Sequence, residues 1–338
     1  MDRQFNTWKV LTAAVALAVA LATPAQAQQV AVTAGEFTKV GLSGGQFLKI
    51  GVGARGTAMA GAYSGVADDA TSVFWNPAGL VEVAGWGANF SHTFWFAGMS
   101  HSFAAAVIPL SEKFRLAASF TGFNSGDITI TTTNEQSGIG GIYNVADIAI
   151  GVTLAGYLTE QFSFGATAKF VNHGFTNMSA SGFVFDIGTR YNTGFNGVTL
   201  GFSINSLGTQ QTYTGSDVGR TNPPYNGLDQ SPIDMSMMTS AFEVPLSFKA
   251  GLGVDMFKGF IADAPETDID GTVIHSWIMA ADFETFADVP EQFAIGTEYA
   301  FREFIALRAG YRFGSDQFGL AGGVGLKYRS GTFDGRVD

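Results

Sequence analysis

The 338-residue sequence predicts an all-β protein, a transmembrane antiparallel β-barrel, and three observations lead to this fold class. Segments of about nine to thirteen residues alternate apolar and polar side chains, which suits tilted membrane strands better than the shorter strands of most soluble sandwiches. The composition combines 46% hydrophobic residues, 31 Phe and 44 Gly with only 14% charged residues. A barrel uses aromatic side chains on its lipid face and Gly where strands pack tightly. Short turns also alternate with long polar connections, as in outer-membrane barrels.

Other features of the composition exclude alternatives. The chain contains no Cys, so no disulfide bond stabilises it. A net charge of −11 disfavours nucleic-acid binding, which calls for basic patches. After the N-terminal leader no uninterrupted apolar run approaches twenty residues, so the mature chain has no segment that predicts a membrane-spanning helix.

The first residues predict a secretory signal peptide. Arg3 and Lys9 form a charged region, the apolar run 10–22 follows, and Ala25-Gln26-Ala27 has the form of a cleavage site. We therefore assign residues 1–27 to a signal peptide, 28–83 to an N-terminal segment with a plug, and 84–338 to the barrel. The expected location is the outer membrane of a Gram-negative-type bacterium, in contact with its lipid.

The stretch 51–80 differs from the rest of the chain, because it is dense in Gly and Ala and closes on Asn-Pro-Ala-Gly-Leu. It predicts a compact plug with the later segments as a wall around it. Gly51, Gly53 and Gly56 match the dinucleotide-binding pattern G-x-G-x-x-G, but no buried strand precedes them and no βαβ unit surrounds them. We interpret these glycines as positions where backbone packs closely in a confined space.

Alternation with period two defines the wall. Between residues 161 and 171, Phe162, Phe164 and Phe170 share one face, while Lys169 lies on the other. Single charges and Gly on the polar face are typical of a lumen. The predicted strands are 85–96, 102–110, 114–123, 147–158, 161–171, 182–191, 198–205, 246–256, 273–286, 293–301, 305–313 and 318–328.

The connections between these strands differ in length. Tight turns are predicted at 111–113, 159–160 and 192–196, and long polar loops at 124–145 and 207–243. Short periplasmic turns that alternate with long outer loops are the usual outer-membrane arrangement. The connection 259–271 is longer than its place in this alternation predicts.

Several of these segments resemble a known family. Residues 53–80 (GARGTAMAGAYSGVADDATSVFWNPAGL) resemble the start of PorV/PorQ-type proteins in the FadL outer-membrane transporter superfamily. The resemblance continues at 201–208 (GFSINSLG), 244–253 (VPLSFKAGLG) and 296–313 (GTEYAFREFIALRAGYRF), and so covers nearly all of the mature chain.

The resemblance implies a FadL-type barrel of about fourteen strands with an N-terminal hatch in the lumen. It also implies one of two functions. The first is a PorV-like component of protein export and surface attachment in type IX secretion, whose partners are exported proteins or secretion components; the 296–313 strands favour it. The alternative is FadL-like transport of long-chain hydrophobic molecules across the outer membrane. Neither function involves catalysis or a cofactor.

Two groups of residues in the plug are candidate site residues. The Asn-Pro-Ala triplet of FadL-type hatches corresponds here to Asn76, Pro77 and Ala78. Pro presets a turn that an Asn side chain can brace, so the triplet is either a latch against the barrel wall or an ordinary fold-defining turn.

The second group is Arg55, Asp68 and Asp69, which cannot lie inside a plugged lumen without partners. We expect them to pair with one another or with basic residues of the wall. A ligand carboxylate on one wall Arg is the alternative. The wall candidates are Lys169, Arg190, Lys249, Arg308 and Arg312.

The longest loop contains the apolar residues Met235, Met237, Met238 and Phe242. They are expected to contact a hydrophobic substrate or a partner, or to cap the mouth of the barrel.

Polar clusters elsewhere favour no metal site. Asp263, Glu266, Asp268 and Asp270 crowd one loop, but their spacing does not match an EF-hand, which favours a solvated acidic loop over calcium binding. The four histidines, His92, His101, His173 and His275, lie one to a segment without metal-ligand spacing. Neither G-x-S-x-G nor H-E-x-x-H occurs, so no catalysis is expected.

The last segment affects the strand count. About twelve full strands precede residue 329, and 331–338 has the pattern of the start of a thirteenth. Bacterial single-chain barrels have an even number of strands, and a closing strand should end apolar and aromatic rather than on Arg336-Val337-Asp338. We therefore expect the sequence to lack roughly 20–30 residues of the last strands, with a gap between the first strand and the last.

Overall fold

A computed structural model of the protein describes residues 41, 43–216, 219–222, 233–236, 239–261, 267, 273–302, 304–315, 318–330 and 333–338. The chain divides into two units, Met1–Thr38 and Lys39–Asp338, and all described elements belong to the second. The predicted signal peptide and the acidic residues Asp263, Glu266, Asp268 and Asp270 lie outside the described residues.

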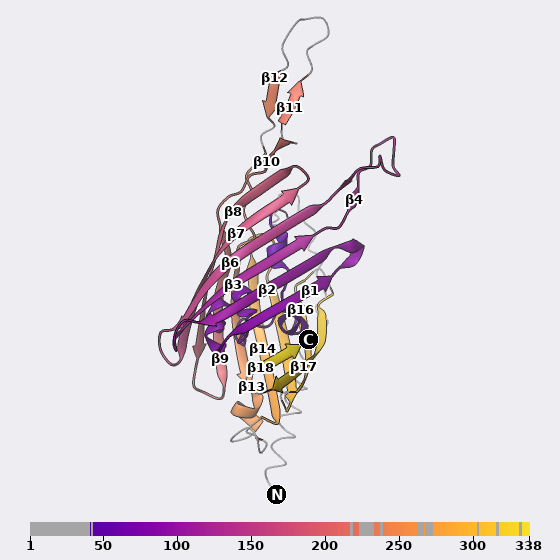
Figure 1. The fold of residues 1–338 in the computed structure, drawn as a ribbon. Coiled ribbons are helices and arrows are strands. Elements are labelled where there is room, and N and C mark those ends of the chain that lie inside the picture. Colours follow the sequence, from indigo (N-terminus) through magenta and orange to yellow (C-terminus); the bar gives the residue numbers. More distant parts are fainter. Residues whose placement is uncertain are drawn as a thin grey trace, which may run out of the picture. The chain divides into compact units, whose positions relative to one another are not determined.

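One antiparallel sheet forms the wall of the second unit (Figure 1). Among the described residues, thirteen strands follow one another in chain order, each hydrogen-bonded to the next, and the short strand β10 (Thr214–Gly215) pairs with β8 outside this order. Each segment that alternation predicts as a strand is one. The strands are β1 (Gly87–Phe94), β2 (Ser100–Pro109), β3 (Phe114–Asn124), β6 (Val145–Tyr157), β7 (Phe162–Phe175), β8 (Met178–Asn192), β9 (Val198–Gly208), β13 (Ser247–Asp255), β14 (His275–Phe286), β15 (Gln292–Phe301), β16 (Ile305–Phe313), β17 (Leu320–Ser330) and β18 (Phe333–Val337).

The two faces of the sheet differ in polarity as the alternation predicts. In β8, Phe183 and Phe185 are 57% and 45% exposed, whereas Asp186 between Phe185 and Ile187 is only 1% exposed. Successive side chains of a strand point to opposite faces, so one face presents apolar side chains outward and the other holds polar groups inside. This arrangement is that of a membrane barrel with a polar interior.

Connections of different length lie at the two ends of the strands (Figure 1). The β2–β3, β6–β7 and β8–β9 turns are short and define the short-turn end, while the β3–β6 and β9–β13 connections define the long-loop end. The connection after β13 is the exception that the sequence indicates, and it begins with the π-helix η5 (Phe257–Ile261) at the short-turn end.

Two small ladders inside the long connections were not predicted. They pair β4 (Ile128–Thr129) with β5 (Ile142–Tyr143), and β11 (Gly219–Asn222) with β12 (Ile233–Ser236). These segments are only two to four residues long, so they are too short to show a period-two pattern.

The outermost strands of the sheet order are β1 and β18. Gly87 of β1 pairs with Val107 of β2, and Val337 of β18 pairs with Leu326 of β17. The described residues include no pairing between β1 and β18. As in the sequence count, β18 follows twelve longer strands of this order.

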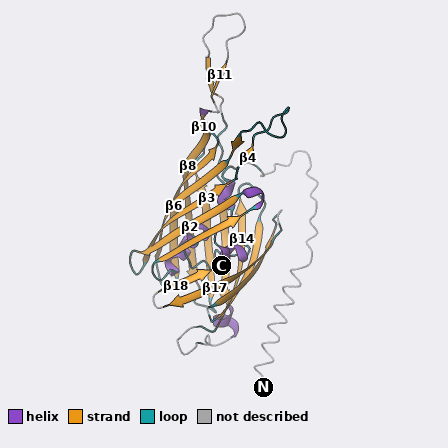
Figure 2. Cartoon of the chain, turned by 45° about the vertical axis from the view of Figure 1, so that its right-hand side comes forward, coloured by secondary structure: helices purple, strands orange, loops and turns teal. Residues whose placement is uncertain are grey.

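Residues 43–83, which we name the plug, pack against the buried face of the sheet. The plug contains η1 (Gln46–Lys49), α2 (Ala54–Ala58), α3 (Ser72–Trp75) and η2 (Pro77–Glu82), and these helices lie among the strands in Figure 2. No helix within the described ranges is both long and apolar enough to cross a membrane.

Apolar side chains join the plug to the wall in three clusters. One packs Leu80 and Val81 against Phe103 and Val107 of β2. A second joins Met59, Tyr63 and Trp75 to Ala280 and Ala294, and a third joins Phe47 and Leu48 to Val171 and Val184. The hydrophobic core of this unit is therefore the interface between the plug and the inner face of the sheet.

Candidate functional site

Arg55 connects the plug to the wall. It lies on α2, is 5% exposed, and donates from Nε and Nη2 to the carboxylate of Glu298 on β15, at 2.9 Å each. Glu298 also accepts from Nε of Arg308 on β16, at 2.5 Å. A buried carboxylate between two guanidinium groups ties α2 to two adjacent strands, and each charge has a partner.

The remaining partners of Arg55 lie within the plug. Its Nη1 donates to the Tyr63 hydroxyl at 2.8 Å and to Asp68, and the Asp69 carboxylate lies 3.6 Å away. Tyr63 in turn donates to Asp69 at 2.8 Å. The structure thus brings together Arg55, Asp68 and Asp69.

These surroundings shift the pKa of both Asp69 and Arg55. Burial disfavours the ionised form of Asp69, but Arg55 and hydrogen bonds from Thr71 and Tyr63 outweigh it and hold the pKa of this carboxyl below its usual value. Burial also disfavours the charge of Arg55, but Asp68, Tyr63, Glu298 and Asp69 outweigh it and raise its pKa well above the usual value. Both groups are therefore ionised at neutral pH.

The basic residues expected as partners of Asp68 and Asp69 pair elsewhere. The sequence analysis expected a wall cation to pair with an acidic residue of the plug. The observed pair has the opposite polarity, because the plug residue that faces the wall is Arg55 and its wall partner is the acidic residue Glu298. The observed ion pairs of the wall cations are Lys169 with Asp186, Arg190 with Glu82 at 2.5 Å, Lys249 with Glu284 at 2.9 Å, Arg308 with Glu298 at 2.5 Å, and Arg312 with Glu284 at 3.5 Å.

Asn76 braces a turn and also contacts the wall. Its side-chain oxygen accepts from the backbone N–H of Ala78 at 3.1 Å, while its amide donates to the carbonyls of Ser64 at 2.9 Å and Thr189 of β8 at 3.1 Å. Pro77 begins η2, where its missing N–H costs no hydrogen bond. Ser163 of β7 donates to the Ala78 carbonyl at 3.1 Å, so the triplet is bonded to two strands.

Wall glycines lie where the plug backbone passes. A β-carbon added to Gly201 of β9 would overlap the Ser64 carbonyl. One added to Gly296 of β15 would lie 2.7 Å from the Met59 carbonyl oxygen, closer than real β-carbons approach. Any side chain at these positions would displace the plug. The wall glycines that meet plug backbone are Gly165, Gly201, Gly251, Gly253, Gly296 and Gly310.

The glycines of the apparent dinucleotide motif also have a packing role. A β-carbon on Gly56 would lie 2.7 Å from the Trp75 ring, and Gly53 precedes α2 with a φ of 71°. Within the described residues no three His, Cys, Asp or Glu side chains are grouped to hold a metal ion.

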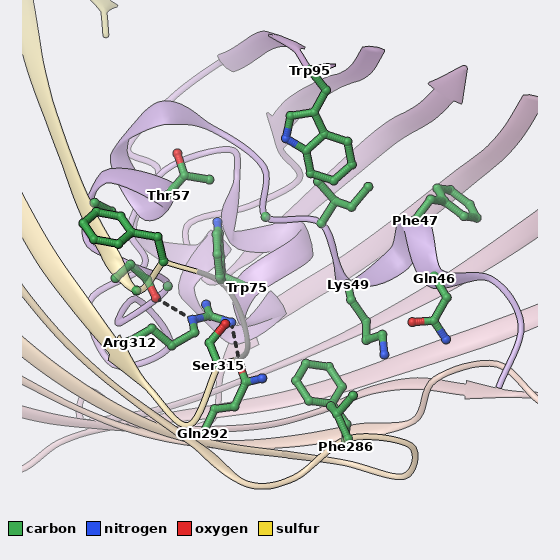
Figure 3. A pocket seen from close by; sticks show the side chains of 18 of the residues that line it. Gln46, Phe47, Lys49, Thr57, Trp75, Trp95, Phe286, Gln292, Arg312 and Ser315 are labelled. Carbon is green, nitrogen blue, oxygen red and sulfur yellow. Dashed lines mark hydrogen bonds between the residues drawn. The ribbon is translucent and has the colours of Figure 1, made fainter. Parts of the chain in front are cut away.

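A cavity of about 640 Å³ lies between the plug and the strands at the long-loop end (Figure 3). We name it the mouth cavity. One side of it is lined by the plug, through helix η1, Thr57 and Trp75. The other side is lined by the wall residues Gln292, Arg312 and Ser315. Six aromatic side chains contribute to its lining: Phe47, Trp75, Trp95, Phe123, Phe286 and Phe318.

The two cations of the mouth cavity are neutralised. Lys49 donates to both carboxylate oxygens of Asp288, at 3.0 and 2.9 Å, and Asp288 is 2% exposed. Arg312 donates to the Ala60 carbonyl at 2.9 Å and to Gln292 at 3.1 Å, and lies 3.5 Å from Glu284. The cavity therefore combines aromatic surface with satisfied polar groups.

Phe242 packs against two aromatic side chains at the long-loop end. It packs edge-on against His173, with ring centroids 5.8 Å apart, and lies 5.4 Å from the Tyr213 ring. The adjacent Glu243 carbonyl accepts from Gly44 N–H at 2.9 Å, which ties the plug to this loop. Met235 belongs to β12, while Met237 and Met238 lie outside the described residues.

Glu298, Asp288 and the wall glycines are site residues that sequence reasoning missed as partners of the plug. Alternation places Glu298 on the inner face, directly opposite Arg308 on the neighbouring strand. An acidic residue at this position could have been identified from the sequence as a possible partner for Arg55. Asp288 lies in the β14–β15 turn, where no periodic signal exists. The partner of a plug residue depends on where the plug lies, which strand periodicity does not specify.

Comparison with known proteins supports the fold. No protein-family model matches the sequence, and no curated protein matches it either. The crystal structure of the Pseudomonas putida toluene transporter TodX aligns with a TM-score of 0.51 and 14% identity, over 82% of this chain and 88% of TodX. The Ralstonia pickettii toluene transporter TbuX gives a TM-score of 0.49 at 12% identity, over 82% and 89% of the two chains. A Pseudomonas aeruginosa FadL homologue gives 0.45 at 13% identity, over 83% and 87%.

The similarity to TodX shows the same antiparallel β-barrel fold and confirms the predicted fold class. TodX is named a toluene transporter, and CymD is named a monoaromatic hydrocarbon channel. They give no support to a PorV-like role in type IX secretion, which depended on individually weak strand motifs.

Proposed function

We propose that this protein admits small hydrophobic molecules through the outer membrane and that the mouth cavity is where they first bind. The observation that carries the proposal is the cavity of about 640 Å³ with six aromatic side chains, placed between the plug and the strands at the long-loop end. Ligand pockets of about 300–1,000 Å³ with mostly apolar linings are typical of small-molecule sites. TodX is named a toluene transporter, and a monoaromatic hydrocarbon is the corresponding ligand here.

The charges of the cavity favour an uncharged ligand. Asp288 neutralises Lys49, and Glu284 lies beside Arg312, so a ligand carboxylate would have to displace a protein carboxylate. Aromatic rings, in contrast, gain stacking and edge contacts with the lining without any rearrangement of ion pairs. We therefore place uncharged aromatic or aliphatic molecules ahead of anionic amphiphiles as ligands.

Uptake by whole cells tests the proposal, because toluene crosses a phospholipid bilayer unaided and only an intact lipopolysaccharide-covered outer membrane is a barrier to it. Cells of a Gram-negative host that express the protein should take up toluene faster than cells that carry the empty vector. Val289→Trp, which fills part of the mouth cavity, should lower that rate. The matched control is Leu307→Trp on β16, where the side chain is 53% exposed and faces outward. Equal rates with and without protein would overturn the proposal.

A second experiment tests the alternative function, a role as an accessory of protein export. If the tagged full-length protein recovers the C-terminal signal domains of exported proteins, and its expression leaves toluene uptake by the cells unchanged, the transport proposal fails. Recovery of no such domain, together with faster entry, supports transport.

A further inference from the structure

The outward face of β14 and β15 carries hydrogen-bonded aromatic side chains at the short-turn end. The Tyr299 hydroxyl lies 2.7 Å from Nδ1 of His275. Trp277 Nε1 donates to the Thr297 hydroxyl oxygen at 2.8 Å. These side chains share a face with Phe301, which is 43% exposed, because residues two apart along a strand and residues opposite in a ladder lie on one side of the sheet. Aromatic rings with satisfied polar tips are typical of the boundary between lipid and water.

The helix η5 packs against this outward face. The Phe257 ring stacks on His275, with ring centroids 5.9 Å apart and an angle of 23° between the planes. His275 in turn contacts the Phe301 ring, with centroids 5.4 Å apart. Because the short turns of outer-membrane barrels lie on the periplasmic side, this packing places η5 beside the inner leaflet of the membrane.

The rest of η5 presents two further apolar side chains, and both are exposed. Phe260 is 55% exposed and Ile261 is 39% exposed. The side chain of Lys258, which lies between the two phenylalanines in sequence, is 62% exposed. The helix therefore combines an apolar surface with one exposed cation, which is the composition of a segment that lies at a membrane interface.

Neighbouring connections extend this apolar surface. Phe304 in the β15–β16 turn is 53% exposed, and Phe195 in the β8–β9 turn is 68% exposed. The β8–β9 turn adjoins η5, since a β-carbon on Gly197 would lie 3.5 Å from Cβ of Lys258. We name the combined surface the rim, and its residues are Phe195, Phe257, Phe260, Ile261, Phe301 and Phe304.

Continuity with the wall identifies lipid as the partner of the rim. Phe304 directly precedes β16, whose outward side chains Ile305 and Leu307 are 38% and 53% exposed. The rim is therefore the border of the same apolar surface that faces the membrane. The charges favour a zwitterionic lipid, because the segment 263–270 that follows η5 in the sequence contains four acidic residues, which repel anionic headgroups.

We propose that η5 and the rim form an interfacial anchor that inserts into zwitterionic phospholipid of the inner leaflet. Phe260 and Ile261 enter the region where headgroups meet acyl chains, as the apolar faces of interfacial helices do. The Lys258 ammonium stays at the level of the headgroups on its flexible stem. The mouth cavity lies at the opposite, long-loop end, so this anchor does not depend on the transport function.

A fluorophore on η5 tests the insertion. The native chain has no Cys, so Phe260→Cys in the full-length protein can be labelled at one site with the environment-sensitive dye NBD. In phosphatidylcholine liposomes its emission should shift to the blue, and a nitroxide on an upper acyl carbon should quench it several-fold more than aqueous iodide does. The matched control is Glu112→Cys in the β2–β3 turn at the same end, which is exposed and should be quenched mainly by iodide.

Two results for labelled Phe260→Cys would overturn the anchor. Stronger quenching by iodide than by the nitroxide would place η5 in water. Protection from both quenchers would show that protein, such as a second copy of the chain, covers the rim.

A charge introduced into the rim tests whether apolar contact holds the helix in lipid. Adding Ile261→Asp should raise iodide quenching of labelled Phe260→Cys several-fold in barrels that still show heat-modifiable migration. Leu158→Asp is the matched control, because this 65% exposed residue lies in the β6–β7 turn outside the rim and its substitution should leave the quenching unchanged. Equal quenching in all three folded proteins would also overturn the anchor.

Vesicle composition tests the choice of lipid. Replacing part of the phosphatidylcholine by phosphatidylglycerol should leave nitroxide quenching of labelled Phe260→Cys unchanged or lower it, because the acidic segment next to η5 repels the added charge. Stronger nitroxide quenching in the anionic vesicles would overturn the assignment to zwitterionic lipid.

Discussion

The plug contacts two sectors of the wall in different ways. From β7 to β16 its backbone lies directly against wall glycines, such as Gly201 and Gly296, with no room for a β-carbon. At β17 the plug presents the small side chains of Ala54 and Thr57, and the mouth cavity extends to this strand. The nearest approach at Gly323 is to the Ala58 side chain, at 2.8 Å from a β-carbon position, and not to backbone.

The difference teaches that a plug can be held firmly without sealing the lumen. Backbone against glycine fixes position, because a displacement of a few tenths of an ångström loses packing on one side and creates overlap on the other. Small side chains facing a strand leave space that a ligand can occupy. We therefore name β7–β16 the seat and the contact between α2 and β17 the open side.

The largest expected effect comes from breaking the ion pair of the seat. Arg55→Ala leaves Glu298 buried with only one guanidinium, and losing one partner of a buried pair costs about 3–5 kcal/mol. The matched control is Arg190→Ala, whose partner Glu82 is 39% exposed; such pairs contribute about 1 kcal/mol or less. Denaturant unfolding in detergent measures both. Similar losses would show that the seat is not specially stabilised.

A slightly smaller effect is expected when a wall glycine that faces the plug is enlarged. In Gly201→Val the new side chain overlaps the Ser64 carbonyl, and overpacking of this kind costs about 1–3 kcal/mol. The control is Gly322→Val on β17, which points away from the plug, where the nearest heavy atom to the added β-carbon is 3.6 Å away, so little change is expected. Heat-modifiable migration on gels measures the stability of each barrel. If both variants melt together, the close contact between Gly201 and the plug does not stabilise the protein.

The sequence predicted the wall far better than it predicted the contacts of the plug. Each membrane strand can be recognised from its own sequence, because lipid and lumen require opposite polarities at alternate residues. The pairing of Arg55 with Glu298 spans 243 positions and depends on where the plug lies in the lumen. Asn76 was identified from the resemblance to FadL-type hatches and from the preference of Asn-Pro for turns. Its hydrogen bond to the Thr189 carbonyl could not be predicted, because no local sequence pattern shows which strand the turn contacts.

The function was the least predictable property. Single charges on the inner face suggested a ligand carboxylate on a wall Arg, but whether such a charge is free depends on neighbours from other strands. Arg312 illustrates this, since Gln292, Glu284 and the Ala60 carbonyl all surround it. The size of a cavity is likewise set by how segments distant in sequence pack together, so the mouth cavity has no sequence signature.

Removing the amide of Asn76 should weaken the seat by an intermediate amount. Asn76→Ala leaves the Ser64 and Thr189 carbonyls without their donor, and buried unsatisfied groups cost about 1–3 kcal/mol. Asn76→Asp keeps the acceptor for Ala78 N–H but loses the donor, so it should be at least as destabilising. If Asn76→Asp is instead as stable as the native protein, the turn matters and the wall bond does not.

The smallest expected effect concerns bonds that stay within the plug. Asp69 contacts Thr71, Tyr63 and Arg55 without reaching the wall, and its side chain is 31% exposed, so solvent screens part of its interaction. Because its pKa is below the usual value in the folded protein, its contribution to stability is present above about pH 4 and is lost as the pH falls through the folded pKa.

Unfolding of the native protein and of Asp69→Asn across this pH range checks that expectation. The native protein should be the more stable of the two at neutral pH, and the difference should shrink in acid. A difference that is constant with pH would mean that Asp69 contributes through its hydrogen bonds alone and that its charge is immaterial.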